Sequence, residues 1–362
     1  MVNMDKKDYP ILLTRHLDAL MVEWKKVSGE IIDSCRTICP EGSGLADKFI
    51  SFLEVTGKFI RPNMFLFGYR LGGVEPDEKI IRLAISFELL HTYLLIEDDI
   101  IDQSDLRRGI SSVHKLAEEY HQKNLLLGDS KHFGVSIAIT FGLAICAKAC
   151  EIWSNAEMAG IALPQSRKIF DRMHYDVSWG QYLDVMIPTQ RKIPTKEVII
   201  QIMEEKTSKY TIKNPLQSGA VQGGVSHENI LWIAEFGKQL GIAYQIVDDI
   251  LGVYGKPSVT GKPIDSDIHE GKETLLVWSA LESATFFDRK VMIDFYTGND
   301  RSDTAIASIK NIFNKYDVRS KAEGIATEYV NRALEIVHTA PITYSAKQEL
   351  KIFSKFIIER NK

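Results

Sequence analysis

Long segments with apolar residues three and four positions apart dominate this chain, and that spacing is typical of α-helices. Segment 81–90 shows it clearly, and segments 173–185, 198–220 and 229–253 show it over greater lengths. Segment 133–153 is apolar on nearly every side, which predicts a helix near the centre of the fold. Alternating strand patterns joined by Asn-Gly or Asp-Gly turns are absent. We therefore expect one all-α domain over the whole chain, a single large bundle of roughly ten or more helices.

The composition is that of an ordinary globular protein and argues against several functional classes. The chain has 362 residues, enough for a sizeable core, with 45% hydrophobic and 25% charged residues. A formal net charge of −4 without a strongly basic tract predicts no binding to nucleic acid. No apolar run approaches the roughly 20 residues that span a bilayer, and no signal-peptide core follows the first residues. We expect a cytoplasmic protein without a membrane span.

The four cysteines form two pairs with i,i+4 spacing, Cys35 with Cys39 and Cys146 with Cys150. Each pair could lie on one helical face, and a zinc site built from both pairs is one interpretation. The usual zinc spacing is Cys-x2-Cys or similar. We therefore expect buried, reduced thiols.

Two aspartate pairs with similar surroundings, in 95–101 and 245–251, lie within apolar helical segments. Carboxylates placed there need cations or hydrogen bonds to compensate them. On a helix, Asp98, Asp102 and Asp105 share a face, with the first two Cβ atoms roughly 5–6 Å apart. Such oxygen ligands suit Mg²⁺, which takes one or two carboxylates plus substrate phosphates. A solvated acidic helix end, the alternative, does not explain a pair preceded by Leu-Leu-Ile.

Basic residues flank the first pair on both sides along the sequence. Arg107 and Arg108 follow it directly, and Lys58 and Arg61 lie upstream in a Gly-Lys-Phe-Ile-Arg-Pro segment. They could form ordinary surface salt bridges, which are weak. Arginine is also the preferred bidentate partner of phosphate, and metal ions combined with Lys and Arg are how a protein binds a diphosphate.

The second pair has a different set of neighbours. Gln245 and Asp248 are three apart and share a helical face, whereas Gly252 occupies the position of a possible third carboxylate. Lys262 and Lys272 lie in a glycine-punctuated loop that could close on a bound anion or could be an ordinary charged surface loop. Two further pairs of polar residues lie in helical segments, Lys206 with Thr207 and Gln181 with Asp184. Each of these residues alone is more often structural than catalytic.

Taken together, these segments resemble the trans-isoprenyl diphosphate synthases, the polyprenyl synthetase family. From residue 57 to residue 272 the order and spacing match the family motifs Gly-Lys-x-x-Arg-Pro, Asp-Asp-x-x-Asp with Arg-Arg-Gly, Gly-Gln-x-x-Asp, Lys-Thr and Gln-x-x-Asp-Asp. The resemblance implies an isoprenoid synthase fold, an all-α bundle around a deep central cavity, usually as a homodimer. It also implies condensation of isopentenyl diphosphate with an allylic diphosphate (dimethylallyl, geranyl or farnesyl).

The resemblance further implies a role for each matching residue. Asp98 and Asp102 would bind two Mg²⁺ ions and Asp248 a third, all on the allylic diphosphate. The same diphosphate would be held by the basic residues Arg107, Lys206, Lys262 and, in the same loop, Lys272. The diphosphate of isopentenyl diphosphate would be held by Lys58, Arg61, His91 and Arg108. Thr207 and Gln245 would lie near the developing allylic cation.

In this family the residues just before the first aspartate motif form the floor of the tail pocket. Here they include Tyr93 and the smaller Leu94, and Tyr93 would lie roughly 7.5 Å along the helix axis from Asp98. One aromatic residue there, without an insertion in the motif, resembles geranylgeranyl diphosphate synthases. We expect a twenty-carbon product, with fifteen carbons as the alternative. Tyr93 could instead be a core residue.

Two rival functions use related chemistry. A class I terpene cyclase would carry an Asn/Ser/Glu metal motif second and would not need the isopentenyl diphosphate site. A non-catalytic subunit of a heteromeric prenyl synthase commonly loses its aspartate motifs, and this chain keeps both. Gly252 departs from the final Asp that many members have, but the leading Asp248 is the expected ligand, so we expect an active enzyme.

Overall fold

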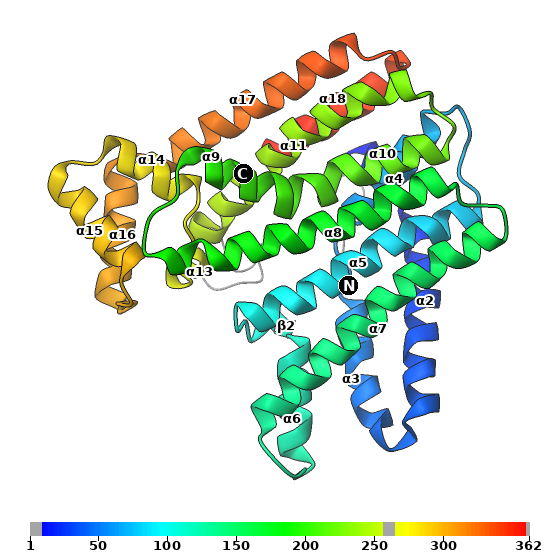
Figure 1. Ribbon diagram of the computed structural model, residues 1–362, viewed down its shortest axis with the longest axis horizontal. Helices are drawn as coiled ribbons and strands as arrows, with labels where there is room; N and C mark the ends of the chain where they lie inside the picture. The colour runs from blue at the N-terminus through cyan, green and yellow to red at the C-terminus, as the bar shows by residue number, and fades with distance from the viewer. Residues whose placement is uncertain (1–8, 256–264, 360–362) are drawn as a thin grey trace. The chain divides into compact units, whose positions relative to one another are not determined.

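The computed structural model describes residues 9–255 and 265–359, and nearly all regular structure in it is helical (Figure 1). Within these residues the only strands are β1 (Leu106–Arg107) and β2 (Ile110–Ser111), which pair antiparallel in a short hairpin. The predicted all-α fold is confirmed, although the sequence did not indicate this hairpin. The described residues divide by their internal contacts into two compact units. The single domain expected from the sequence stays a prediction.

Unit 1 comprises the described part of residues 1–167 together with residues 218–224. Its helices, in chain order, are α1 (Ile11–Thr14), α2 (Leu17–Ile38), a 3₁₀ turn (Pro40–Gly42), α3 (Ser43–Glu54), α4 (Ile60–Arg70), α5 (Glu78–Ile101), α6 (Val113–Lys123) and α7 (Ser130–Met158). Helix α8 (Pro164–Met186) begins in unit 1, and α10 (Asn214–Gln222) ends there.

Helices α5 and α7 pack side by side in the core of unit 1 (Figure 1). Each begins at an aspartate whose side chain accepts a backbone N–H of the first turn, Asp77 for α5 and Asp129 for α7. The rings of Phe87 on α5 and Trp153 on α7 are 6.2 Å apart, edge to face. Trp153 Nε1 also donates a 2.8 Å hydrogen bond to Ser86 Oγ. This buried contact fixes α5, whose carboxyl end carries the first aspartate pair.

Helix α7 corrects one sequence-based expectation. It is long and apolar enough to cross a membrane by length and composition, and 39% of its most apolar stretch is buried. The statement that no apolar run approaches that length was therefore wrong. A partly buried core helix passes the same test, so the absence of a membrane span stays a prediction.

Unit 2 comprises residues 168–217 and the described part of residues 225–362. After most of α8 and a 3₁₀ turn (Pro188–Gln190), its further helices are α9 (Lys196–Met203), a π-helix (Glu204–Lys213), the start of α10, α11 (His227–Tyr254), α13 (Ser266–His269), α14 (Leu275–Ser283), α15 (Phe286–Thr297), α16 (Asp303–Lys315), α17 (Val318–Thr339) and α18 (Tyr344–Glu359).

The single helix predicted over 198–220 is interrupted by the π-helix, which separates α9 from α10. Apolar periodicity does not distinguish i→i+4 from i→i+5 hydrogen bonding over ten residues, so the sequence did not show the change. π-Helical segments are rare and occur frequently at functional sites. This one contains Lys206 and Thr207.

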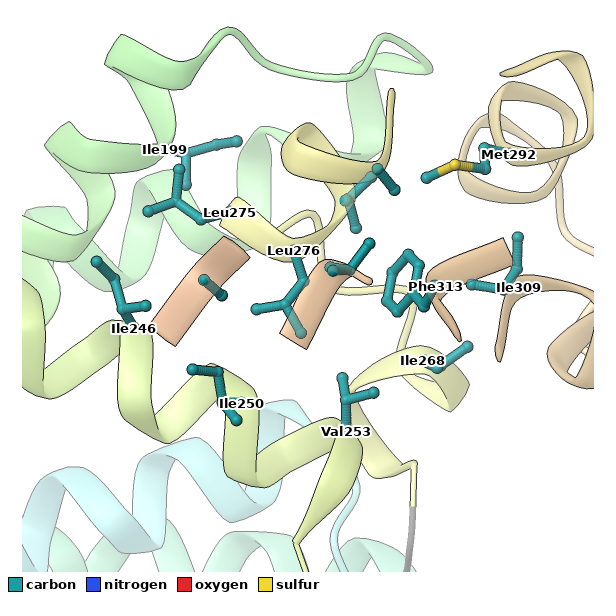
Figure 2. Close-up of a cluster of buried hydrophobic side chains, with 14 of the residues drawn as sticks. Ile199, Ile246, Ile250, Val253, Ile268, Leu275, Leu276, Met292, Ile309 and Phe313 are labelled. Atoms are coloured by element: carbon teal, nitrogen blue, oxygen red, sulfur yellow. The ribbon is translucent and has the colours of Figure 1, made fainter. Parts of the chain in front are cut away.

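The core of unit 2 lies on one side of the carboxyl-terminal half of α11. Figure 2 shows Ile246, Ile250 and Val253 of α11 in one cluster with Leu275 and Leu276 of α14. All five side chains are at most 5% exposed. The spacing of four residues along α11 puts Ile246 and Ile250 on the core face, which leaves a different face of α11 for the polar residues of the second aspartate motif.

The four cysteines are all free, as expected. Only Cys146 is buried, while Cys39 is exposed, so the expectation of burial was wrong for Cys39. In the described part of the chain, no group of three or more His, Cys, Asp or Glu side chains is arranged to hold a metal ion by itself. The zinc interpretation therefore has no support.

Candidate active site

The first aspartate motif lies at the carboxyl end of α5. Asp98 is in the last turn, and Asp102 is the residue that ends the helix, with its backbone N–H donating to Asp98 O at 2.8 Å. The predicted one-turn spacing of these two carboxylates is therefore present. Asp105 was expected on the same face, but the helix has already ended, and its exposed carboxylate lies 3.9 Å from Lys115 Nζ.

The β1–β2 hairpin brings Arg107 back against this helix end. Its Nε donates to Asp99 Oδ1 at 2.8 Å, a terminal nitrogen donates to the same oxygen, and that nitrogen lies 3.5 Å from Asp98 Oδ2. Burial disfavours the charged guanidinium, but the carboxylates of Asp99, Asp98 and Asp102 raise the pKa of Arg107 overall. The predicted allylic diphosphate ligand is thus held charged beside the predicted metal ligands.

Three of the four residues predicted to hold isopentenyl diphosphate lie close together in unit 1. Burial lowers the pKa of His91 well below its usual value, and the positive charges of Arg61 and Arg108 lower it further. A neutral imidazole with guanidiniums nearby offers several hydrogen-bond donors to an anion. Lys58, the fourth, precedes α4, and its Nζ lies 5.8 Å from the centroid of the Tyr9 ring.

Local backbone shape explains the Gly-Lys-Phe-Ile-Arg-Pro segment. A Cβ at Gly57 would lie 2.7 Å from a terminal nitrogen of Arg108, so a larger residue there would displace that guanidinium. Phe59 has a φ of 49°, and its carbonyl accepts from the backbone N–H of Asn63 at 3.0 Å. Pro62 lies in the first turn of α4, where its missing N–H costs nothing. The segment therefore holds Arg61, which is 5% exposed, inside the protein.

A buried carboxylate in this region was missed by the sequence reasoning. Glu88 lies on α5, three residues before His91, and is 4% exposed. Burial raises the pKa of Glu88, whereas the nearby Arg61 and Arg108 lower it. Its signal was present in the sequence, because a single carboxylate within an apolar helical run needs a cation to compensate it. Glu88 thus lies close enough to both arginines for their charges to act on it, while burial, the larger effect, raises its pKa overall.

In unit 2 the second motif forms a hydrogen-bonded chain. Thr207 Oγ1 donates to Gln245 Oε1 at 2.5 Å, and Gln245 Nε2 donates to Asp249 Oδ1 at 2.7 Å. The sequence reasoning grouped Gln245 with Asp248, but its hydrogen-bond partner is Asp249, four residues away. Burial raises the pKa of Asp249 well above its usual value, and the negative charge of Asp267 raises it further. Asp248 is half-buried on the same helix.

The predicted diphosphate-binding lysines of unit 2 lie beside carboxylates. Lys206 Nζ donates to Asp184 Oδ2 at 2.5 Å, so the polar face of α8 noted in the sequence holds this lysine. Lys272 Nζ lies 2.7 Å from Glu270 Oε2. Lys262 lies outside the described residues. A bound diphosphate would have to compete with these carboxylates for the two lysines.

Asp267 occupies the space beside Gly252 on α11. A Cβ at position 252 would overlap the Asp267 carboxylate, so glycine is required for this close approach. Gly252 leaves the second motif without the carboxylate that many family members have at this position. The structure instead places a carboxylate from another segment at that point, and the sequence offered no signal for it, because the two residues are fifteen apart along the chain.

The proposed chain-length residue Tyr93 lies on α5, and its ring faces α7. It is half-buried, forms a hydrogen bond with Glu97, and its ring would be 3.3 Å from a Cβ at Gly142. Burial, with help from Glu97, raises the pKa of Tyr93 to about 12. Leu94, also half-buried, follows it. The deep central cavity expected from the resemblance stays a prediction, as does the floor role of Tyr93.

The carboxylates fit Mg²⁺ by the chemistry of their donors. Asp98 and Asp102 offer two hard oxygen donors one turn apart, and in the described residues no third His, Cys, Asp or Glu side chain completes a metal-binding group with them. Mg²⁺ keeps several waters and binds through one or two carboxylates plus substrate phosphates. These residues therefore fit a metal ion that arrives with a diphosphate better than one held by protein alone.

Comparison with known proteins agrees with this geometry. The model of the polyprenyl synthetase family matches residues 44–315. The chain is 30% identical to the geranylfarnesyl diphosphate synthase of Aeropyrum pernix, over 88% of this chain and 95% of that protein. It is also 30% identical to the geranylgeranyl diphosphate synthase of Saccharolobus solfataricus, over 84% of this chain and 87% of the relative.

A solved structure extends the similarity to three dimensions. The geranylgeranyl pyrophosphate synthase of Corynebacterium glutamicum, complexed with isoprenyl diphosphate and magnesium, superposes with a TM-score of 0.84 at 28% identity. The match covers 94% of this chain and 98% of that one. Fold, motif order and the matched length agree, and the chain therefore belongs to the polyprenyl synthetase family.

Proposed function

We propose that this protein is a Mg²⁺-dependent short-chain trans-prenyltransferase that condenses isopentenyl diphosphate with an allylic diphosphate. The observation that carries the proposal is the arrangement along α5. His91, with Arg61 and Arg108 nearby, is proposed to hold the diphosphate of isopentenyl diphosphate, and Glu88 is the carboxylate beside the two arginines. Asp98 lies seven residues farther along the same helix, or roughly 10 Å. We propose that this helix contributes to the binding of two diphosphates, and that Mg²⁺ accompanies the one beside Asp98.

The chemistry proposed for these residues follows from charge. The allylic C–O bond breaks, and the diphosphate leaves with the electron pair. The double bond of isopentenyl diphosphate then attacks the allylic carbon, and loss of a proton forms the new double bond. Bound Mg²⁺, three ions in the family pattern, would neutralise the leaving diphosphate. Arg107, Lys206, Lys262 and Lys272 are proposed to hold that diphosphate, with Asp98, Asp102 and Asp248 as metal ligands.

The developing cation needs an environment without water, since water would quench it. Thr207 and Gln245 are proposed to lie near this cation, and their mutual hydrogen bond holds both side chains in one orientation.

We propose geranylgeranyl diphosphate as the main product, with farnesyl diphosphate as the alternative. The support is the single aromatic residue Tyr93 five positions before Asp98, with the smaller Leu94 after it. The similar enzymes include both geranylgeranyl and geranylfarnesyl diphosphate synthases, so family membership alone does not set the length of the prenyl product.

We also propose that the protein acts as a cytoplasmic homodimer. The support for the homodimer is that large apolar side chains are exposed on α7 and, separately, on α8. Ile139 and Leu143 of α7 are 56% and 62% exposed, and Tyr175, Trp179 and Tyr182 of α8 are about as exposed. Large exposed apolar side chains on neighbouring turns are typical of surfaces that a partner covers.

The test is incubation of the purified chain with labelled isopentenyl diphosphate, Mg²⁺ and each allylic diphosphate in turn, followed by chromatography of the dephosphorylated products. We expect elongation that requires Mg²⁺, with the C20 alcohol as the main product. Release of a cyclised hydrocarbon from an allylic diphosphate alone would favour a terpene cyclase. No elongation with any primer would favour a non-catalytic subunit.

A further inference from the structure

The two members of each aspartate pair differ in burial. The side chain of Asp98 is 21% exposed and that of Asp99 only 1%. In the second pair, Asp248 is half-buried and Asp249 is 5% exposed. Consecutive helical residues do not share a face, so the two carboxylates of a pair cannot both reach one ligand in the same way. In each pair the second carboxylate is turned into the protein.

The buried carboxylate of the first pair holds an arginine. Asp99 Oδ1 accepts hydrogen bonds from Nε and from a terminal nitrogen of Arg107. The guanidinium is planar and carries five N–H donors in a fixed fork. When one edge is bound to Asp99, the direction of the remaining donors is set, and an anion that binds them need not order the side chain itself.

The buried carboxylate of the second pair holds a carboxamide. Gln245 Nε2 donates to Asp249 Oδ1, and Gln245 Oε1 accepts from Thr207 Oγ1. A hydroxyl has one proton to donate, so Thr207, having given it to Gln245, presents only oxygen lone pairs elsewhere. Asp249 therefore orients two side chains, Gln245 directly and Thr207 through it.

We propose that the second aspartate of each pair, Asp99 and Asp249, is a positioning residue and not a metal ligand. Asp99 orients Arg107 for a diphosphate, and Asp249 orients Gln245 and Thr207 for the reacting carbon. The inference rests on the proposed function for the identity of the substrate. The two aspartates of each pair then have different roles, because the more exposed Asp98 and Asp248 remain as the metal ligands.

The first experiment measures metal binding without catalysis. Mn²⁺ binding in the presence of inorganic diphosphate is followed by electron paramagnetic resonance for the wild type and for Asp98→Asn, Asp99→Asn, Asp248→Asn and Asp249→Asn. We expect at least tenfold weaker Mn²⁺ binding for Asp98→Asn and Asp248→Asn, and less than twofold change for the other two. Asp105→Asn, at an exposed carboxylate outside the site, is the control. Loss of Mn²⁺ affinity in Asp99→Asn or Asp249→Asn equal to that of its neighbour would overturn the proposal.

The second experiment uses rescue by a conservative variant. The asparagine in Asp249→Asn can still accept the hydrogen bond of Gln245, whereas the leucine in Asp249→Leu cannot. We expect at least tenfold higher kcat for Asp249→Asn than for Asp249→Leu. A carboxylate that binds metal would instead lose activity equally in both variants, which would contradict the positioning role. For Asp99→Asn we expect about a tenfold higher KM for the allylic diphosphate with little change in the Mg²⁺ concentration required.

The third experiment asks whether Asp249 acts through Gln245. In a Gln245→Met background, Asp249→Asn should change kcat less than twofold, because the partner of Asp249 is gone. If Asp249→Asn lowers kcat as much in that background as in the wild type, the proposal is wrong. This test does not depend on Asp249→Leu, a variant that could fail to fold. If the wild type elongates no primer, the proposed function fails, but the Mn²⁺ comparison still decides this inference.

Discussion

At the scale of single residues, Tyr93 is the position where a small change should alter the product most. Its ring lies against Gly142 of the neighbouring helix, and its hydroxyl bonds Glu97. If the ring forms the floor of the tail pocket, Tyr93→Ala removes it, and the main product should lengthen by at least one five-carbon unit. Chromatography of the products measures this. Tyr93→Phe, which keeps the ring and removes only the hydroxyl, should leave product length unchanged, and an unchanged length in Tyr93→Ala would refute the floor role.

Glu273 is the residue that should make stability depend on pH. It is 9% exposed, and burial raises its pKa to about 7, against the opposing effect of Arg301. A folded-state pKa above the unfolded value of 4.5 means that the folded protein binds the proton more tightly. The stabilisation that protonated Glu273 gives the folded state is fully present below pH 4.5 and is lost as the pH rises towards about 7.

This linkage predicts that the wild type loses roughly 1–3 kcal/mol of unfolding free energy between pH 5 and pH 7.5 through this one group, at about 1.4 kcal/mol per pKa unit. Glu273→Gln should remove that part of the slope, as measured by urea unfolding at a series of pH values. Glu282→Gln, at an exposed position of α14, should keep the wild-type slope. Parallel curves for the wild type and Glu273→Gln would contradict the prediction.

At the scale of elements, the π-helix decides where Lys206 and Thr207 lie. Helix α11 approaches it closely because Gly241 has no side chain, and a Cβ there would lie 2.5 Å from Ser208 Cα. Ser208, in turn, donates from Oγ to the carbonyls of Gly237 and Lys238 on α11. The contact therefore ties the residues next to Thr207 to the helix that carries Gln245.

Gly241→Ala should destabilise the protein by about 2 kcal/mol, because overpacking a buried contact forces the backbone to shift. It should also lower kcat, since Thr207 would move relative to Gln245. Denaturant unfolding and steady-state kinetics measure the two effects. Gly324→Ala in α17, where a Cβ meets nothing within 4 Å, is the matched control and should be neutral or slightly stabilising. Equal stability of the two variants would show that the close approach is not required.

At the scale of the whole molecule, the exposed apolar face of α7 bears on assembly. Leu143 is 62% exposed, and Leu231 at the start of α11 is equally exposed. If α7 forms the dimer contact, Leu143→Glu places a charge in a buried interface and should give a monomer in sedimentation velocity. Leu231→Glu should leave the dimer intact, because it changes an equally exposed leucine elsewhere. A dimer that survives Leu143→Glu would place the contact on another surface.

The sequence by itself determined the helical class and the family, because apolar periodicity and ordered motifs are properties of neighbouring residues. It also determined the one-turn spacing of Asp98 and Asp102, which follows from helix geometry. Only the tertiary structure decided which residues meet across elements: Arg107 returns to Asp99 through a hairpin, Lys206 meets Asp184, and Asp267 fills the space beside Gly252. The burial of Asp99 and Asp249 was likewise decided only by the tertiary structure. Burial depends on which helix packs against which face, and a pattern along one helix does not contain that information.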